Sequence, residues 1–232
     1  MEKILAITLA RGGSKRLPGK NIKELEGIPL IEYTIRAAKN SKKITRFLVS
    51  TDDQKIANIA KNAGAEVPFL RPSSLSNDQA SPIDGCLHAL KELKKREGYE
   101  PDIVVLLQPT SPFRTEKHID EALHLLKQKN AESVISACPL EHELDTFRCI
   151  NKEGKMSPIF PFTQDIDSNF SDRVRLNGAI YAIKTATLLQ HQSFYTQNTY
   201  PYLMKAKESI DIDTAFDFEV ATALFQNPHT KK

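Results

Sequence analysis

The chain has 232 residues, which is enough for one α/β domain with a small appendage and a sizeable hydrophobic core. With 32 Lys plus Arg against 29 Asp plus Glu, the net charge is only +3, too small to indicate nucleic acid or a membrane as partner. No apolar run reaches the length of a membrane span, and three cysteines without CxxC spacing favour a reduced, cytoplasmic setting without a zinc site.

Short apolar runs predict strands, and segments with apolar residues three or four positions apart predict helices. In chain order we expect a strand at 4–10, helix at 30–39, strand at 47–50, helices at 53–62 and 82–95, strand at 103–107, helix at 117–129 and strand at 134–137. This alternation predicts an α/β fold with a doubly wound, mostly parallel, Rossmann-like sheet that carries helices on both faces.

The regular alternation stops between residues 139 and 174, where Pro, Asn, Asp and Phe occur without a helical period. We interpret this stretch as an inserted hairpin or arm within a single domain of residues 1–232. Regular structure resumes with a strand at 178–183, and the last predicted element is a helix at 214–224.

The segment 9–21 directly follows the first predicted strand and is rich in glycine and positive charge. Gly12 and Gly13 let the backbone approach an anion, and four cations follow in the same loop: Arg11, Lys15, Arg16 and Lys20. Ligands of open α/β sheets bind beyond the carboxyl ends of the strands, so this position favours a triphosphate site over an exposed basic turn. Neither GxxxxGK[ST] nor GxGxxG is present.

Segments 9–21, 70–78, 108–114, 177–181 and 209–214 resemble, in this order, five motifs of the acylneuraminate cytidylyltransferases, the enzymes that activate sialic acids. The resemblance implies a nucleotidyltransferase that joins CTP to an acidic nine-carbon sugar, an acylneuraminate or a legionaminate-type acid, and releases diphosphate. It also implies Mg²⁺ or Mn²⁺ as cofactor, and a homodimer formed through arms at 139–174.

Carried over residue by residue, the resemblance implies a nucleotide site at Arg11, Gly12, Ser14, Lys15, Lys20, Asn21, Arg71, Asp78, Ala80 and Ser81. The sugar site would comprise Gln108, Arg173, Arg175, Tyr181, Phe194 and Tyr195. Arg11, Lys20 and Asp211 would be catalytic, and Asp211 and Asp213 would hold the metal ion. The alternatives are an ordinary turn at Arg71, a rigid loop at Gln108 and core packing for the aromatic residues.

Asp211 and Asp213 are separated by one residue, so on an extended segment both side chains share one face while Ile210 and Ile212 point into the core. Two carboxylates at a strand end suit Mg²⁺, which binds a few carboxylates plus substrate phosphates. The alternative is that Asp213 only charges the start of the helix that follows the capping pattern 214–217.

The chain departs from the family's motifs at three positions. Pro82 stands where the family often has a small hydroxyl residue, Asp145 lies near a family Lys, and Asp167 takes the place of a family Arg. Arg173 and Arg175 are then the nearest candidates for the sugar carboxylate, which indicates either a variant acid such as legionaminic acid or a rearranged arm. Two rival functions are a 3-deoxy-manno-octulosonate transferase, whose loop also contains Arg-Leu-Pro-Gly-Lys, and a non-catalytic nucleotide-binding module.

Overall fold

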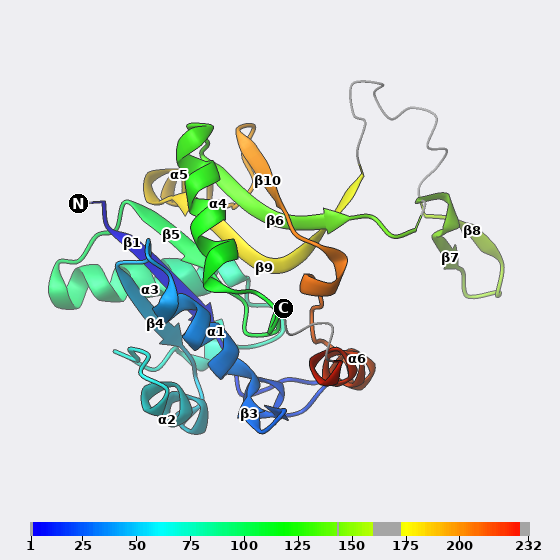
Figure 1. Ribbon diagram of the computed structural model, residues 1–232, viewed down its shortest axis with the longest axis horizontal. Coiled ribbons are helices and arrows are strands. Elements are labelled where there is room, and N and C mark those ends of the chain that lie inside the picture. The colour runs from blue at the N-terminus through cyan, green and yellow to red at the C-terminus, as the bar shows by residue number, and fades with distance from the viewer. Residues whose placement is uncertain (1, 143, 160–172, 228–232) are drawn as a thin grey trace.

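A computed structural model of the chain describes residues 2–142, 144–159 and 173–227, and its centre is a six-stranded sheet (Figure 1). Across the sheet the strands are β10 (Thr199–Leu203), β6 (Ser133–Pro139), β9 (Val174–Lys184), β5 (Ile103–Leu106), β1 (Ile4–Leu9) and β4 (Arg46–Ser50). Only β9 runs antiparallel to its neighbours in this sheet. The predicted mostly parallel α/β sheet is therefore confirmed.

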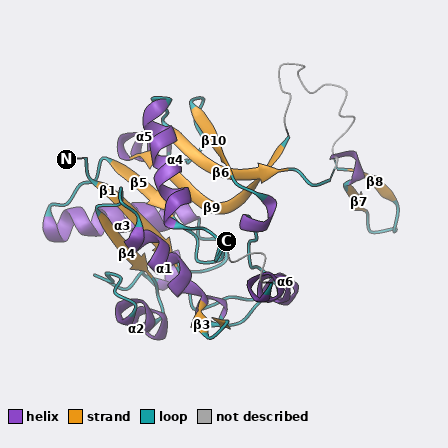
Figure 2. Cartoon of the chain, in the orientation of Figure 1, coloured by secondary structure: helices purple, strands orange, loops and turns teal. Residues whose placement is uncertain are grey.

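Helices cover both faces of the sheet, as Figure 2 shows. Helices α1 (Leu30–Asn40), α2 (Gln54–Asn62) and α4 (Glu116–Gln128) pack on one face, and α3 (Pro82–Glu97) and α5 (Thr185–His191) on the other. The strands alternate accordingly: in β1, Ile4 and Ala6 belong to the first core and Leu5 and Ile7 to the second. A parallel strand buried on both faces is apolar throughout, which explains the uninterrupted hydrophobic runs.

A third, smaller core joins the C-terminal helix to the start of the chain. Helix α6 (Ala215–Gln226) packs beside the hairpin of β2 (Glu24–Leu25) and β3 (Ile28–Pro29) through Ala221, which is fully buried with Leu25. This contact fixes the segment that precedes α6 beside the loop that follows β1.

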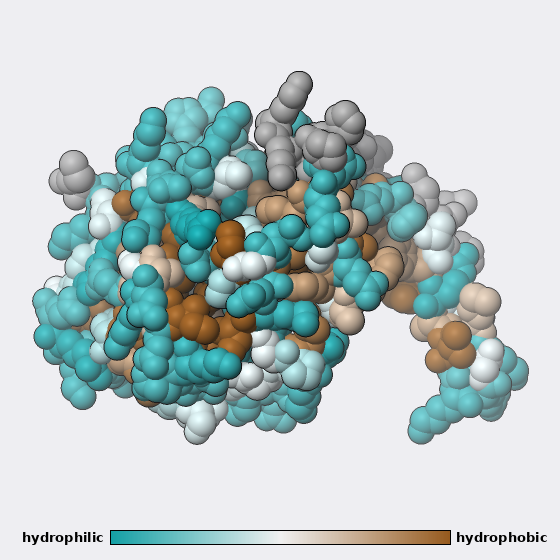
Figure 3. All heavy atoms as spheres, turned by 60° about the horizontal axis from the view of Figure 1, so that its bottom comes forward, coloured by the Kyte–Doolittle hydropathy of each residue, from teal (hydrophilic) through white to brown (hydrophobic). Residues whose placement is uncertain are grey.

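Between the ends of β6 and β9 the chain leaves the body of the molecule. Strands β7 (Arg148–Ile150) and β8 (Met156–Pro158) pair there as an antiparallel hairpin, which Figure 3 shows standing apart from the body. Its exposed apolar side chains are Phe147, Ile150, Met156 and Ile159. Phe160, Phe162 and Asp167 lie outside the described residues. Within the described ranges, no helix has the length and apolar character that crossing a membrane requires.

Candidate active site

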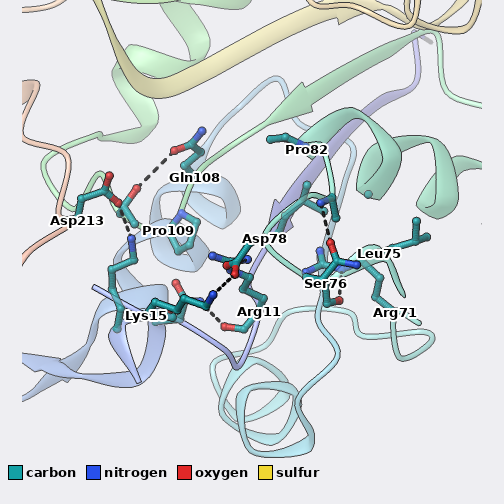
Figure 4. Close-up of a pocket in the computed structure, with 18 of the residues that line it drawn as sticks. Arg11, Lys15, Arg71, Leu75, Ser76, Asp78, Pro82, Gln108, Pro109 and Asp213 are labelled. Carbon is teal, nitrogen blue, oxygen red and sulfur yellow. Dashed lines mark hydrogen bonds and ion pairs between the residues drawn. The ribbon is translucent and has the colours of Figure 1, made fainter. Parts of the chain in front are cut away.

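A cavity of about 470 Å³ opens at the carboxyl ends of β1 and β5, where the sheet topology predicts a ligand site (Figure 4). Four segments line it: the loop after β1, the loop before α3, the loop after β5 and, through Asp213, the segment before α6. Of the predicted site residues, the cavity is lined by Arg11, Ser14, Lys15, Lys20, Asn21, Arg71, Asp78, Ala80, Ser81, Gln108 and Asp213.

Asp78 meets the phosphate loop from the opposite wall of this cavity. Its carboxylate lies 3.0 Å from the Arg11 guanidinium and also pairs with Lys15 (Figure 4). The Lys15 ammonium, followed by Arg11, lowers the pKa of Asp78 below its ordinary value. A carboxylate therefore occupies the position where these two cations would meet an anionic ligand.

Asp213 forms ion pairs with the other two cations of the loop. It lies 2.7 Å from the Lys20 ammonium and 2.5 Å from the Arg16 guanidinium. Lys20 is the more buried of the two, so its pair is the less screened by water. Each of the four predicted loop cations is thus paired with a carboxylate.

Gly12 and Asn21 shape the loop that follows β1. The Gly12 N–H donates to Asp52 Oδ1 at 3.1 Å, and a Cβ at Gly12 would lie 2.7 Å from Asp53 Oδ2. Gly12 is therefore needed for close packing against the start of α2, and its N–H is already bonded within the protein. The buried Asn21 side chain donates to the Arg11 carbonyl at 2.9 Å and so fixes the loop.

Arg71 forms a buried part of the cavity wall rather than an ordinary exposed turn. Its Nε donates to Ser76 Oγ at 2.9 Å and its Nη1 to the Ser50 carbonyl at 3.2 Å. Burial lowers the pKa of this guanidinium, opposed first by the nearby Asp52 charge. These bonds hold the guanidinium rigidly against the cavity.

Ser81 combines a place in the cavity wall with a structural task. Its Oγ accepts the Ile83 N–H at 3.0 Å, and Asp84 accepts the Ser81 N–H at 3.2 Å, which together form a capping box for α3. Pro82 occupies the first helical turn, where its missing N–H costs nothing.

Gln108 and Asp211 approach one point because Gly178 has no side chain. Gly178 has a φ of +74°, and a Cβ there would lie 3.1 Å from Gln108 Oε1 and 3.3 Å from Asp211 Oδ2. Any larger residue would be strained in its backbone and would push these two side chains. The structure thus brings the predicted sugar ligand and the predicted metal ligand together.

Asp211 has the features of an incomplete ligand site. Its Oδ1 is buried and has no hydrogen-bond partner among the described residues. Burial raises the pKa of the carboxyl, whereas the hydroxyl of Thr110 lowers it. Such an oxygen is costly to bury unless a bound group completes its bonding.

The segment carrying the two aspartates is not the strand end that we expected. Residues 209–213 form no strand; the Ile212 N–H bonds the Thr110 carbonyl at 2.9 Å, while Ile210 and Ile212 pack into the third core. The capping pattern at 214–217 is confirmed, because Thr214 and Asp217 form the capping box of α6. Asp213 stands directly before this box, with its N–H donating to Asp217 Oδ2 at 3.1 Å, and its role at the helix start stays a prediction.

These residues fit a divalent cation in part. No group of three or more His, Cys, Asp or Glu side chains with metal-binding geometry occurs among the described residues. Mg²⁺ commonly takes one or two carboxylates and completes its shell with substrate phosphates and water. The unpartnered Asp211 oxygen could supply one such ligand, whereas Asp213 is paired with Lys20 and Arg16 in this structure.

The predicted aromatic residues differ in their surroundings. Phe194 is core, as the packing alternative expects, and its ring lies 5.4 Å from that of Tyr181. Burial raises the pKa of Tyr181 to about 12, and the nearby Tyr195 and Asp211 add to this rise. Tyr195 is exposed. The effect of the Asp211 charge on Tyr181 places this ring in the neighbourhood of the predicted metal ligand.

The two predicted arginines lie at the base of the arm, outside the cavity lining. Arg175 pairs with Glu141 at 3.6 Å, and the Arg173 carbonyl accepts the Leu140 N–H at 3.0 Å. The structure of this chain does not bring them to Gln108.

Sequence reasoning missed Asp52, Thr110 and Arg114. Arg114 belongs to the motif at 108–114 and is buried, with bonds to the Gln108 and Ala179 carbonyls. Its inclusion in that motif was the one available indication.

The comparisons with known proteins agree with this geometry. The family model described as cytidylyltransferase matches residues 5–229. The chain belongs to the cytidylyltransferase family. It is a nucleotidyltransferase.

Two curated sequences and one solved structure are similar to this chain over nearly its whole length. CMP-N,N'-diacetyllegionaminic acid synthase of Legionella pneumophila is 38% identical over 226 residues, covering 97% of each chain. N-acylneuraminate cytidylyltransferase of Escherichia coli is 33% identical over 99% of this chain and 54% of its own length. Among solved structures, a CMP:2-keto-3-deoxy-manno-octonic acid synthetase in complex with CTP superposes with a TM-score of 0.72 at 19% identity, covering 97% of this chain and 98% of its own, which supports the fold.

Proposed function

We propose that this cytidylyltransferase transfers CMP from CTP to a nonulosonic acid of the legionaminic type and releases diphosphate. The observation that carries the proposal is the cavity lined by a cationic loop, the buried Arg71 and Gln108, whose side chain meets that of Asp211 beside Gly178. The similarity to the Legionella synthase over nearly the whole chain favours a legionaminate-type acid over other nine-carbon acids.

In the reaction, the anomeric hydroxyl of the sugar attacks the α-phosphorus of CTP, its proton goes to solvent, and the bond to the diphosphate oxygen breaks. Arg11 and Lys20 stabilise the negative charge that develops on the departing diphosphate. CTP must first displace Asp78 from Arg11 and Lys15, so binding exchanges one anionic partner for another. Gln108 orients the sugar through its amide, and Arg71 faces the cytosine.

A divalent cation, Mg²⁺ or Mn²⁺, would be held by Asp211 and Asp213 together with the triphosphate. When bound, it would neutralise phosphate charge and polarise the phosphorus for attack. Displacement of Asp213 from Lys20 would leave that lysine for the phosphates.

The same proposal includes a cytoplasmic homodimer. The exposed Phe147, Ile150 and Met156 of the arm suit burial against a second arm. Because Arg173 and Arg175 lie at the base of this arm, a partner's arm would be the route by which either could reach a sugar carboxylate.

A nucleotide panel tests the base selectivity. Diphosphate release should be measured with CTP, UTP, ATP and GTP at a fixed concentration of legionaminic acid. CTP should exceed UTP at least severalfold, since one lost base-specific hydrogen bond costs about 1–3 kcal/mol. Equal turnover with UTP would contradict the assignment of Arg71 to cytosine.

A further inference from the structure

Arg114 is a buried cation whose charge no carboxylate of the described residues neutralises. Its side chain is 2% exposed, and none of the ion pairs within the described residues involves it. Burial lowers the pKa of Arg114 to about 9, which still leaves it charged at neutral pH. Taking a charge out of water is costly, and a buried apolar residue of similar size would often stabilise a fold as well or better. Packing alone therefore does not explain an arginine here.

The guanidinium lies where the ladder between β5 and β9 ends. The last pair in the register is Leu106 with Tyr181, and continuing the register would place Gln108 opposite Ala179. Instead of a strand-to-strand bond, Arg114 Nη1 donates to both of these carbonyls, at 2.9 Å each. One nitrogen thus bridges the two segments at the second position beyond the last pair of the ladder, where they are too far apart to bond directly.

Strand β9 carries a bulge beside the position where its ladder with β5 ends, which we call the opening. Between its pairs with Ile135 and Ala137 of β6, strand β9 runs from Tyr181 to Leu176, so its four residues 177–180 lie opposite the single residue Ser136. The Ser136 hydroxyl accepts the Ile180 N–H at 2.7 Å and donates to Asn177 Oδ1 at 2.6 Å. Bulges that re-aim side chains are frequent beside active sites.

Hydrogen bonds on each side of this opening connect it to Gln108 and to the segment that carries Asp211. Arg114 Nη2 also donates to Thr34 Oγ1 at 2.5 Å, and Thr34 Oγ1 donates to the Gln108 carbonyl at 3.3 Å. On the other side, Asn177 Nδ2 donates to Ser209 Oγ at 2.8 Å, at the start of the segment that carries Asp211. Gly178 lies between these two ties, against Gln108 and Asp211.

We propose that Arg114 is a positioning residue, which holds β5 and β9 apart and so sets the distance between Gln108 and Asp211 that the sugar requires. This inference rests on the proposed function for the identity of the substrate. Arg114 does not line the nucleotide cavity. Its contribution is therefore to the step that uses the sugar, and CTP binding should be independent of it.

The test compares Arg114→Met and Arg114→Lys with the control Arg46→Met. Arg46 is a partly buried arginine, and it pairs with Glu66 and Glu97 at the start of β4, the end of the strand away from Ser50. CTP affinity is measured by calorimetry, and sugar kinetics by diphosphate release. Arg114→Met should keep the CTP Kd within about threefold and lose about a hundredfold in kcat/KM for the sugar, a loss that an ångström of misplacement can cause. Arg46→Met should lower the Tm and leave both the CTP Kd and the kcat/KM for the sugar unchanged.

A double-mutant cycle with Gln108→Ala separates positioning from general destabilisation. If Arg114 acts through Gln108, the double variant should lose hardly more than the worse single variant. Losses that multiply, or a CTP Kd that weakens as much as the sugar kinetics, overturn the inference.

Two further results complete the test. Should Arg114→Met fail to fold, Arg114→Lys and Thr34→Val must show the same selective loss of sugar efficiency in weaker form, and wild-type sugar kinetics in both overturn the inference. A wild-type enzyme that transfers CMP to no acidic sugar refutes the proposed function instead.

Discussion

Gly178→Ala separates backbone strain from disturbance of the site. Gly178 has a φ of +74°, where a residue with a Cβ is strained by about 1–2 kcal/mol. For a domain of this size that strain corresponds to a Tm decrease of about 2–8 °C. The new methyl group would also lie 3.1 Å from Gln108 Oε1 and 3.3 Å from Asp211 Oδ2, so both must shift by a few tenths of an ångström. Since an ångström of misplacement can cost about a hundredfold, shifts of a few tenths of an ångström in both groups should lower kcat/KM for the sugar by about tenfold.

Gly98→Ala is the matched control. Gly98 has a similar φ of +64° and ends helix α3, and a methyl group at this position would meet no other side chain within 4 Å. It should lose similar stability and keep wild-type kinetics. Thermal denaturation and steady-state diphosphate release on the two variants decide the matter. If Gly178→Ala matches Gly98→Ala in both Tm and kcat/KM, Gln108 and Asp211 do not meet the substrates beside Gly178.

Three other substitutions test the charged groups. Asp211→Asn should reduce turnover by about a hundredfold or more, with partial recovery in excess Mg²⁺ or Mn²⁺, and normal turnover at limiting metal would refute the metal role. Because burial raises the pKa of Asp211, the folded state disfavours its charged form. At pH values above this raised pKa, the Asn variant should therefore have a higher Tm than the wild type, and the gain should vanish at pH values below 3.8, the ordinary pKa of the carboxyl. Asp78→Asn should tighten CTP binding a few-fold at low salt, because a competing carboxylate is removed; weaker binding in calorimetry would mean that Asp78 contacts the nucleotide directly. Arg11→Ala should cripple CTP use with an unchanged Tm, and wild-type kinetics would remove it from the phosphate site.

Much of the fold could be predicted because its strands are buried on both faces and its helices are strongly amphipathic. The predicted strand at 4–10 and helix at 53–62 match β1 and α2 to within about a residue, and Asp53 caps α2 by accepting the Lys55 and Ile56 N–H groups. Strand β10 was missed because Pro201 and three polar or aromatic neighbours hide its pattern. A proline is tolerated there since β10 lies at the edge of the sheet.

The site could be predicted where residues follow strands in sequence, and not where distant segments meet. The loop cations and Gln108 follow β1 and β5 directly, so their place at the cavity could be inferred from topology. The pairing of Asp78 with Arg11 and Lys15 depends on how the loop before α3 folds across the cavity. Local pattern carries no information about such a contact. For the same reason the buried role of Arg114 could not be foreseen from the motif that contains it.

The most direct measurement of the central claim uses CTP, Mg²⁺ and a panel of acidic sugars with the purified protein. The panel should contain N,N'-diacetyllegionaminic acid, N-acetylneuraminic acid, pseudaminic acid and 3-deoxy-manno-octulosonic acid, with mass spectrometry of the products and kcat/KM for each. The proposal predicts a CMP-sugar in equal amount to the diphosphate released, with the highest kcat/KM for the legionaminic acid. A highest kcat/KM for the eight-carbon acid, or diphosphate release from none of the four, would contradict it.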